Sequence, residues 1–117
     1  MRQKILIVED DPLSAEFMKI YLEEQGYEVR AANSLSKSLA DMAEFKPSIV
    51  ITDIRLGDGS GAESAELFRA QGAKTIIGVS GYSKSQLLEM HEDLRYFDQL
   101  LLKPVELSQL AAAVLGR

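Results

Sequence analysis

Five short runs rich in apolar and β-branched residues, each followed by a longer segment with helical periodicity, constrain the fold of this sequence more than any other feature. This alternation is typical of β–α units built on a parallel sheet. Apolar residues occupy consecutive positions in the first, third and fourth runs, which favours strands covered by helices on both faces. The expected strands are Lys4–Val8, Glu28–Ala32, Ile49–Asp53, Thr75–Ser80 and Gln99–Leu102.

Helix start and stop signals fill the segments between these strands. Asp11 is placed to cap the first helix, with Pro12 at the first helical position, where a missing N–H costs nothing. Gly26 ends that helix because glycine tolerates the left-handed conformation. The other signals are Ser34 as a cap and Pro47 as a stop, the capping-box pairs Ser60 with Glu63 and Ser83 with Gln86, and a last helix from near Glu106 to Leu115.

The expected fold is α/β, a doubly wound five-stranded parallel sheet of the flavodoxin-like order 2-1-3-4-5 with helices on both faces. Right-handed crossovers leave two common doubly wound orders, and five strands suit this one. The 117 residues match one compact domain, so we expect a single domain over residues 1–117, with no output domain.

Composition excludes several classes of function. Cysteine is absent and there is one histidine, which argues against disulfide frameworks and zinc sites. A net charge of −5 disfavours direct nucleic-acid binding. The apolar runs are far shorter than the ~20 residues of a membrane span. We therefore expect a cytoplasmic protein that binds neither nucleic acid nor membrane.

Carboxylates gather where the fold brings two strand ends together. Glu9, Asp10 and Asp11 follow the first strand, and Asp53 ends the third. The switch point of the 2-1-3-4-5 order lies between these strands, where ligands of such sheets bind. Neighbouring carboxylates must share protons or be neutralised by a cation, and oxygen donors without histidine or cysteine favour Mg²⁺. Asp11 is explained by its role as a helix cap.

The ends of the last two strands add a hydroxyl and an ammonium group. Ser80, followed by Gly81, ends the fourth strand, and Lys103 follows the fifth. With a metal site and a nucleophile-like Asp53, these groups suit phosphoryl transfer, which depends mainly on positioning and charge neutralisation.

These residues stand in four stretches that together resemble the receiver domains of two-component response regulators. The stretches are Ile5-Leu-Ile-Val-Glu-Asp-Asp-Pro12, Ile49-Val-Ile-Thr-Asp-Ile-Arg-Leu56, Val79-Ser-Gly81 and Leu102-Lys-Pro104. Each is weak alone, but all four occur in the family's order, and the resemblance spans essentially the whole chain.

The resemblance implies a phosphorylation site at Asp53. Asp53 would accept a phosphoryl group from a phosphohistidine on a sensor histidine kinase or histidine phosphotransfer protein. Mg²⁺ would be bound by Asp10 directly, by Glu9 through water, by Asp53, and by the backbone carbonyl of Arg55.

It also implies how the site is read out. Ser80 and Lys103 would contact the phosphoryl group, and Lys103–Pro104 would be a cis peptide bond. Movement of Ser80 would shift the surface of the fourth helix, fifth strand and fifth helix toward a downstream protein target or a fused output domain. Such a domain is not a turnover enzyme, although it promotes its own phosphorylation and dephosphorylation.

Two positions depart from the family pattern. Leu100 stands where the family commonly has a tyrosine or phenylalanine that swings inward on activation, so the usual aromatic switch is in question. The run Leu100–Leu102 is expected to be a core strand more than a partner surface, although Leu100 near an edge could serve both roles. Gly57 replaces a frequent proline and begins a glycine-rich loop that lacks a Walker lysine, so no nucleotide is expected.

Two other functions stay open. An aspartyl-phosphate hydrolase would use a similar sheet, but it needs a second aspartate two residues after the nucleophile, where this chain has Arg55. A receiver-like docking module that works without phosphorylation would keep the fold, and Leu100 keeps this alternative in view.

Overall fold

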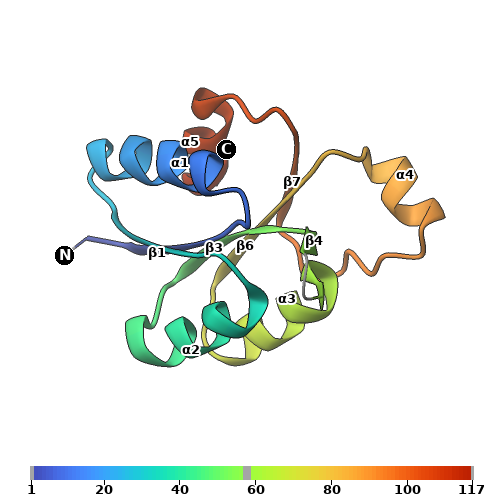
Figure 1. Ribbon diagram of the computed structural model, residues 1–117, viewed down its shortest axis with the longest axis horizontal. Helices are drawn as coiled ribbons and strands as arrows, with labels where there is room; N and C mark the ends of the chain where they lie inside the picture. The colour runs from blue at the N-terminus through green and yellow to red at the C-terminus, as the bar shows by residue number, and fades with distance from the viewer. Residues whose placement is uncertain (1, 57–58, 117) are drawn as a thin grey trace.

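The computed structural model describes residues 2–56 and 59–116, without the side chains of residues 56–62. A parallel sheet in the order β2-β1-β3-β6-β7 runs through its centre (Figure 1). Both the predicted order and the five predicted strand bounds are confirmed. The strands are β1 (Lys4–Val8), β2 (Glu28–Ala32), β3 (Ile49–Asp53), β6 (Thr75–Ser80) and β7 (Gln99–Leu102).

Helices cover both faces of the sheet, as expected for strands that are apolar at consecutive positions. Figure 1 shows α1 and α5 above the sheet, α2 and α3 below it, and α4 standing out beyond β6 and β7. The bounds are α1 (Pro12–Glu24), α2 (Leu35–Phe45), α3 (Gly61–Ala70), α4 (Lys84–Glu89) and α5 (Leu107–Val114).

Each face has its own apolar core. Alternate residues of β1 point to opposite sides, so Ile5 and Ile7 join one cluster and Leu6 and Val8 the other. The first cluster includes Leu22 of α1 and Leu110 of α5, and the second includes Met42 of α2 and Phe68 of α3, all nearly inaccessible to solvent. This packing holds the carboxyl ends of the central strands in place.

Most helix ends follow the predicted signals. Pro12 opens α1, and Gly26 follows its end with φ at 100°. Ser34 Oγ accepts a hydrogen bond from the Lys37 N–H at the start of α2, and Ser83 forms a reciprocal capping box with Gln86 at α4. The side chain of Ser60 lies outside the described side chains, so its capping pair with Glu63 stays a prediction.

Asp11 caps α1 differently from the expectation. It occupies the cap position without a well-formed capping hydrogen bond, and the pKa of its carboxyl is lowered chiefly by the Ser14 hydroxyl and further by the backbone N–H groups of Leu13 and Ser14. Asp11 Oδ2 accepts a hydrogen bond from Ser14 Oγ at 2.6 Å.

Leu100–Leu102 forms a strand as expected, and Leu101 packs against the first cluster, but the run is less buried than a core strand. β7 is the edge of the sheet, its residues are half-buried or exposed, and Leu102 is 54% exposed. Helices cover an edge strand less completely than a central strand, and the apolar character of the run does not reveal its place in the sheet.

The sequence also did not predict a small hairpin after β3. Arg55–Leu56 (β4) pairs antiparallel with Gly59–Ser60 (β5), and two residues per strand are too few for a period-2 pattern. Gly57 lies outside the described residues. None of the helices in residues 2–56 and 59–116 has the length and apolar character that a membrane crossing requires.

Candidate functional site

Three carboxylates meet at the carboxyl ends of β1 and β3, the switch point of the sheet. Parallel pairing of Val8 with Thr52 places the residues that follow, Glu9 and Asp53, beside each other. One carboxylate oxygen from each of Glu9, Asp10 and Asp53 lies within 4.8 Å of the others. The predicted convergence of these side chains is therefore present in the fold.

The backbone around the cluster is fixed by hydrogen bonds to neighbouring strands. The Glu9 N–H donates to the Ala32 carbonyl at 3.0 Å, and the Ile54 N–H donates to the Val79 carbonyl at 3.0 Å. Glu9 is 2% exposed and Asp53 is 4% exposed, whereas Asp10 is exposed to solvent. The pocket thus combines two buried carboxylates with one that faces outward.

Lys103 places its ammonium group among these carboxylates. Its Nζ lies 2.8 Å from Asp53 Oδ1 and 3.4 Å from both carboxylate oxygens of Glu9. The Lys103 N–H donates to the Ser80 carbonyl at 2.8 Å, which ties the lysine backbone to the end of β6. The Lys103–Pro104 peptide bond is cis.

The crowding of like charges perturbs the protonation of the cluster. Burial, reinforced by hydrogen bonding to Asp53 and its negative charge, raises the pKa of Glu9 to about 8. Burial lowers the pKa of Lys103, but the carboxylates of Asp53 and Glu9 outweigh this effect, and the net pKa is raised. Without a bound cation, Glu9 is therefore mostly protonated at neutral pH and Lys103 is charged.

The donor set fits a hard divalent cation. Carboxylate oxygens select Mg²⁺, Ca²⁺ or Mn²⁺ over metals that prefer nitrogen or sulfur. Within residues 2–56 and 59–116, no group donates a hydrogen bond to the buried Asp53 Oδ1, which faces Lys103 as an ion pair alone. A buried oxygen in this state is available to a metal ion or to a reaction.

Ser80 lies at the end of β6, beside the cluster, and is 7% exposed. Its Oγ accepts a hydrogen bond from the backbone N–H of Tyr82 at 3.0 Å. In this hydrogen bond the serine oxygen is the acceptor, so its hydroxyl proton is not used by Tyr82. The sequence analysis identified Ser80 but missed Tyr82. An aromatic residue two positions after a strand points to this site only after the serine has been identified as part of it.

Other predicted positions lie near the cluster but interact elsewhere. The exposed Arg55 directs its guanidinium to Glu92, with 3.3 Å between Nη1 and Oε1, so its backbone carbonyl as a metal ligand stays a prediction. Leu100 of β7 pairs with Gly78 of β6 and is half-buried.

A larger hollow opens beside the cluster, between α1 and the segment before α5. Its volume is about 550 Å³, and its walls include Phe17, Met18 and Val105 in addition to Glu9 and Lys103. The buried face of α1 uses Ala15, Met18 and Leu22, which leaves Phe17 62% exposed at this hollow.

Comparison with known proteins gives one consistent relationship. The profile of the response regulator receiver domain family matches residues 5–115. Among curated proteins, the DNA-binding response regulator MtrA of Mycolicibacterium smegmatis is 29% identical over 118 aligned residues, covering 100% of this chain and 51% of that protein. The chain thus spans about half the length of this relative.

Solved structures show the same fold. A CheY-like response regulator receiver domain from Methanospirillum hungatei has a TM-score of 0.87 at 29% identity, covering 99% of this chain and 93% of that one. A response regulator from Burkholderia pseudomallei, solved with a phosphorylated aspartic acid, a calcium ion and citrate, has a TM-score of 0.81 at 24% identity, covering 95% of this chain and 65% of that one.

Proposed function

We propose that this chain, which belongs to the response regulator receiver domain family, is a phosphorylation-dependent signalling switch in which Asp53 accepts a phosphoryl group. One observation supports this assignment above the others. Two buried carboxylates, one exposed carboxylate and the ammonium of Lys103 converge at the switch point of the sheet. The buried Asp53 Oδ1 has the Lys103 ammonium as its partner, 2.8 Å away, which places a positive charge beside the oxygen that would accept the phosphoryl group.

The metal that suits this pocket is Mg²⁺. Asp10 and Asp53 would bind it directly, Glu9 through water, and Arg55 through its backbone carbonyl. When bound, it supplies positive charge against the oxygens of the transferring phosphoryl group. The exposed position of Asp10 leaves room for the waters that Mg²⁺ retains.

The phosphoryl donor would be a phosphohistidine on a sensor histidine kinase or histidine phosphotransfer protein. An Asp53 oxygen attacks phosphorus, a P–O bond forms, and the P–N bond to the histidine breaks with the electron pair left on the imidazole. Lys103 Nζ, already 2.8 Å from Asp53 Oδ1, would neutralise a phosphoryl oxygen. The Ser80 hydroxyl would donate a hydrogen bond to another.

The product would be an acyl phosphate that acts as a signal. Turning of Ser80 toward the phosphoryl group would shift the surface formed by α4, β7 and α5, which is a change of population between two conformations. That surface would meet a downstream protein target or a fused output domain in the cytoplasm. We include in this proposal that residues 1–117 form one domain that does not itself bind nucleic acid.

Arg55 argues against a phosphatase. Hydrolases that form aspartyl phosphates need a second carboxylate two residues after the nucleophile as general acid and base. Arg55 stands there and pairs with Glu92. The domain would therefore promote its own phosphorylation and dephosphorylation without turning over an external substrate.

Leu100 favours a second candidate, a docking module that works without phosphorylation. The family's moving aromatic side chain is absent from this position of β7. If Asp53 never accepts a phosphoryl group, the α4, β7 and α5 surface would function in one fixed conformation.

Intact-mass measurement after treatment with acetyl phosphate or phosphoramidate and Mg²⁺ tests the proposal. We expect one labile phosphoryl adduct on the wild-type chain and none on Asp53→Asn. A wild-type chain that never gains the adduct with either donor supports the docking module. Sustained release of phosphate from phosphomonoesters over many turnovers supports the hydrolase.

A further inference from the structure

We propose that Tyr82 is the moving aromatic side chain of this switch, and that its ring enters a cavity beside α4 when Ser80 turns toward the phosphoryl group. This inference rests on the proposed function and extends it to the readout. It assigns a role to a residue outside the metal and phosphorylation site. It also explains how a chain with Leu100 on β7 can still respond to phosphorylation.

The cavity lies between the start of α4 and the edge strand β7. Its volume is about 190 Å³, and its apolar walls come from Ile54, Leu87, Leu100, Leu101 and Leu102. An apolar cavity of ~150 Å³ in another protein takes up benzene, so this space is large enough for a phenol ring. Ser80 and Tyr82 also line it, which places the candidate ring at the cavity and next to the serine.

Leu100 leaves this space open because its side chain packs toward Gly78. A Cβ atom added at Gly78 would lie only 3.0 Å from Leu100 Cδ2 and 2.8 Å from Phe97 Cδ1. The Phe97 ring is therefore held over the glycine, where it packs against the core cluster on the α2 and α3 face. Tyr82, in contrast, is 46% exposed and has solvent-accessible ring surface to bury.

A hydrogen bond couples Tyr82 to the phosphorylation site. The Tyr82 N–H donates to Ser80 Oγ at 3.0 Å, so the serine oxygen holds the loop that carries the ring. When Ser80 Oγ turns to donate to a phosphoryl oxygen, this acceptor moves away from the Tyr82 N–H. Apart from its two chain neighbours, no described residue has an atom within 4 Å of a Cβ atom built on Gly81, so the chain between the two residues has room to turn.

Burying the Tyr82 ring would then stabilise the phosphorylated conformation. The ring would exchange water for apolar walls, and its hydroxyl group could stay at the open side of the cavity. Ser83 begins α4 through its capping box with Gln86, so movement of the preceding residue is transmitted directly to that helix. The readout would begin with α4, which follows Tyr82 in the chain.

A single tryptophan tests this inference, because the chain contains none. In Tyr82→Trp treated with acetyl phosphate and Mg²⁺, we expect the emission maximum to move to shorter wavelength as the adduct forms. The matched control is Leu88→Trp, at a position of α4 that is 54% exposed, where we expect no such shift. Adding Leu100→Phe to Tyr82→Trp should fill the cavity and abolish the shift while the adduct persists.

Intact mass of the same samples separates the two claims. Absence of the adduct overturns the proposed function, and this inference with it. An adduct with unchanged emission from Tyr82→Trp overturns the movement of Tyr82 alone.

Hydrogen exchange tests the same movement without tryptophan, whose indole ring is larger than the phenol ring of Tyr82. Phosphorylation should slow exchange in residues 81–89 of the wild type and of Tyr82→Phe, but not of Tyr82→Ala. Equal slowing in Tyr82→Ala would overturn the proposal.

Discussion

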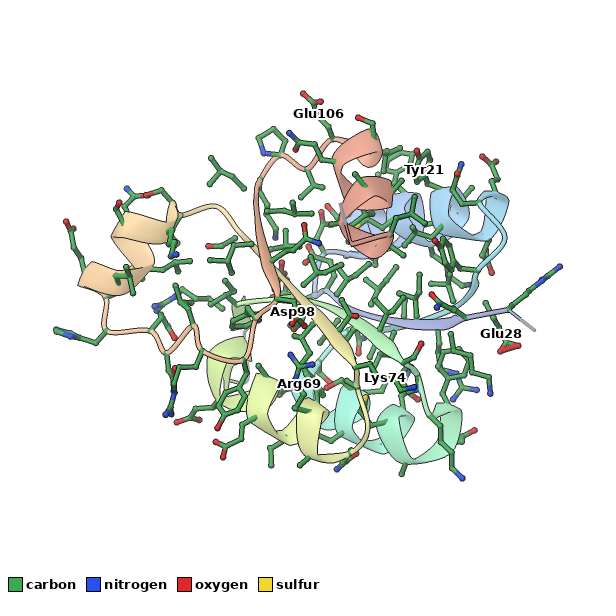
Figure 2. All side chains as sticks on the ribbon, turned by 180° about the vertical axis from the view of Figure 1, so that it is seen from behind. Tyr21, Glu28, Arg69, Lys74, Asp98 and Glu106 are labelled. Carbon is green, nitrogen blue, oxygen red and sulfur yellow. The ribbon has the colours of Figure 1, made fainter. Side chains whose placement is uncertain are left out.

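The two ends of the parallel sheet arrange their charged groups in opposite ways. At the amino ends of β6 and β7, the Arg69 guanidinium donates to the carbonyls of Lys74 and Tyr96 and to Asp98 Oδ2. Asp98 Oδ2 also accepts from the Ile76 N–H at 2.7 Å, and Figure 2 shows Arg69, Lys74 and Asp98 close together. At the carboxyl ends, three carboxylates lie close together, and the ammonium of Lys103 pairs with two of them, Glu9 and Asp53.

This difference distinguishes a structural charge cluster from a reactive one. The Arg69 cluster joins α3 to β6 and β7, and its hydrogen-bond donors and acceptors pair with one another. In the carboxyl-end cluster, Lys103 is shared between Asp53 and Glu9, and burial together with the charge of Asp53 raises the pKa of Glu9 to about 8. Buried charge that is incompletely neutralised lowers stability and favours binding of a cation, which is typical of a functional site.

The largest expected effect on stability comes from breaking the satisfied cluster. Arg69→Ala removes the guanidinium from two backbone carbonyls and leaves the Asp98 carboxylate with the Ile76 N–H, so it should lower the free energy of unfolding by about 2 kcal/mol. Urea denaturation measures this change, and Arg69→Lys should recover part of it. Phosphorylation of Asp53 should continue in both variants. Unchanged stability of Arg69→Ala would mean that the cluster is not structural.

Mg²⁺ affinity tests the cluster at the carboxyl end of the sheet. Asp10→Ala removes a direct ligand and should weaken Mg²⁺ binding about tenfold, equivalent to ~1.4 kcal/mol. Its neighbour provides the matched control, because the Asp11 carboxylate bonds Ser14 instead of joining the cluster, so Asp11→Ala should bind Mg²⁺ normally. Isothermal titration calorimetry compares the two. Equal affinities would remove Asp10 from the metal site.

A matched pair of aspartate substitutions should change stability in opposite directions. Without Mg²⁺, Asp53→Asn removes a negative charge that helps to keep Glu9 protonated, so Glu9 can ionise and replace Asp53 as the partner of Lys103, and the free energy of unfolding should rise by up to about 1 kcal/mol. Asp98→Asn weakens its ion pair with Arg69 and should lower it by about 1 kcal/mol. Thermal denaturation of the two variants measures both signs. If both substitutions changed the free energy of unfolding in the same direction, the two charge clusters would not differ in the way proposed.

A further expected effect is a gradual dependence of stability on pH. Glu9 has a pKa of about 8 in the folded chain and an ordinary value of 4.5. Between these values the folded state holds a proton that the unfolded state has lost, so the metal-free protein should lose stability as the pH rises from about 4.5 to about 8. Glu9→Gln should flatten this trend in denaturation curves. A slope that Glu9→Gln leaves unchanged would assign the titration to another group.

The sequence predicts the sheet and the carboxylates well because both depend on local patterns. β-branched runs bounded by helix caps indicate the bounds of all five strands, and the 2-1-3-4-5 order then brings the residues after β1 and β3 together. Glu9, Asp10, Asp53, Ser80 and Lys103 were each identified by their position at a strand end. The structure adds the ion pairs and the burial of Glu9, which no local pattern contains.

The features that were missed depend on contacts distant in sequence. Arg69 and Asp98 are 29 residues apart, and a charged residue near the end of a helix ordinarily indicates a solvated surface. Leu102 is exposed because it lies on an edge strand. Phe17 is exposed because α1 buries the face that carries Met18 and Leu22. The cavity near Tyr82 depends on how Leu100 packs on Gly78, which is decided only in three dimensions.

The central claim is that charge at the carboxyl end of the sheet serves phosphorylation, whereas charge at the amino end serves stability. Intact-mass measurement of the wild type, Asp53→Asn and Asp98→Asn, each treated with acetyl phosphate with and without Mg²⁺, tests it most directly. The account predicts one phosphoryl adduct on the wild type and on Asp98→Asn, only with Mg²⁺, and none on Asp53→Asn. An adduct that persists on Asp53→Asn, or one that is lost from Asp98→Asn while that variant stays folded, would contradict it.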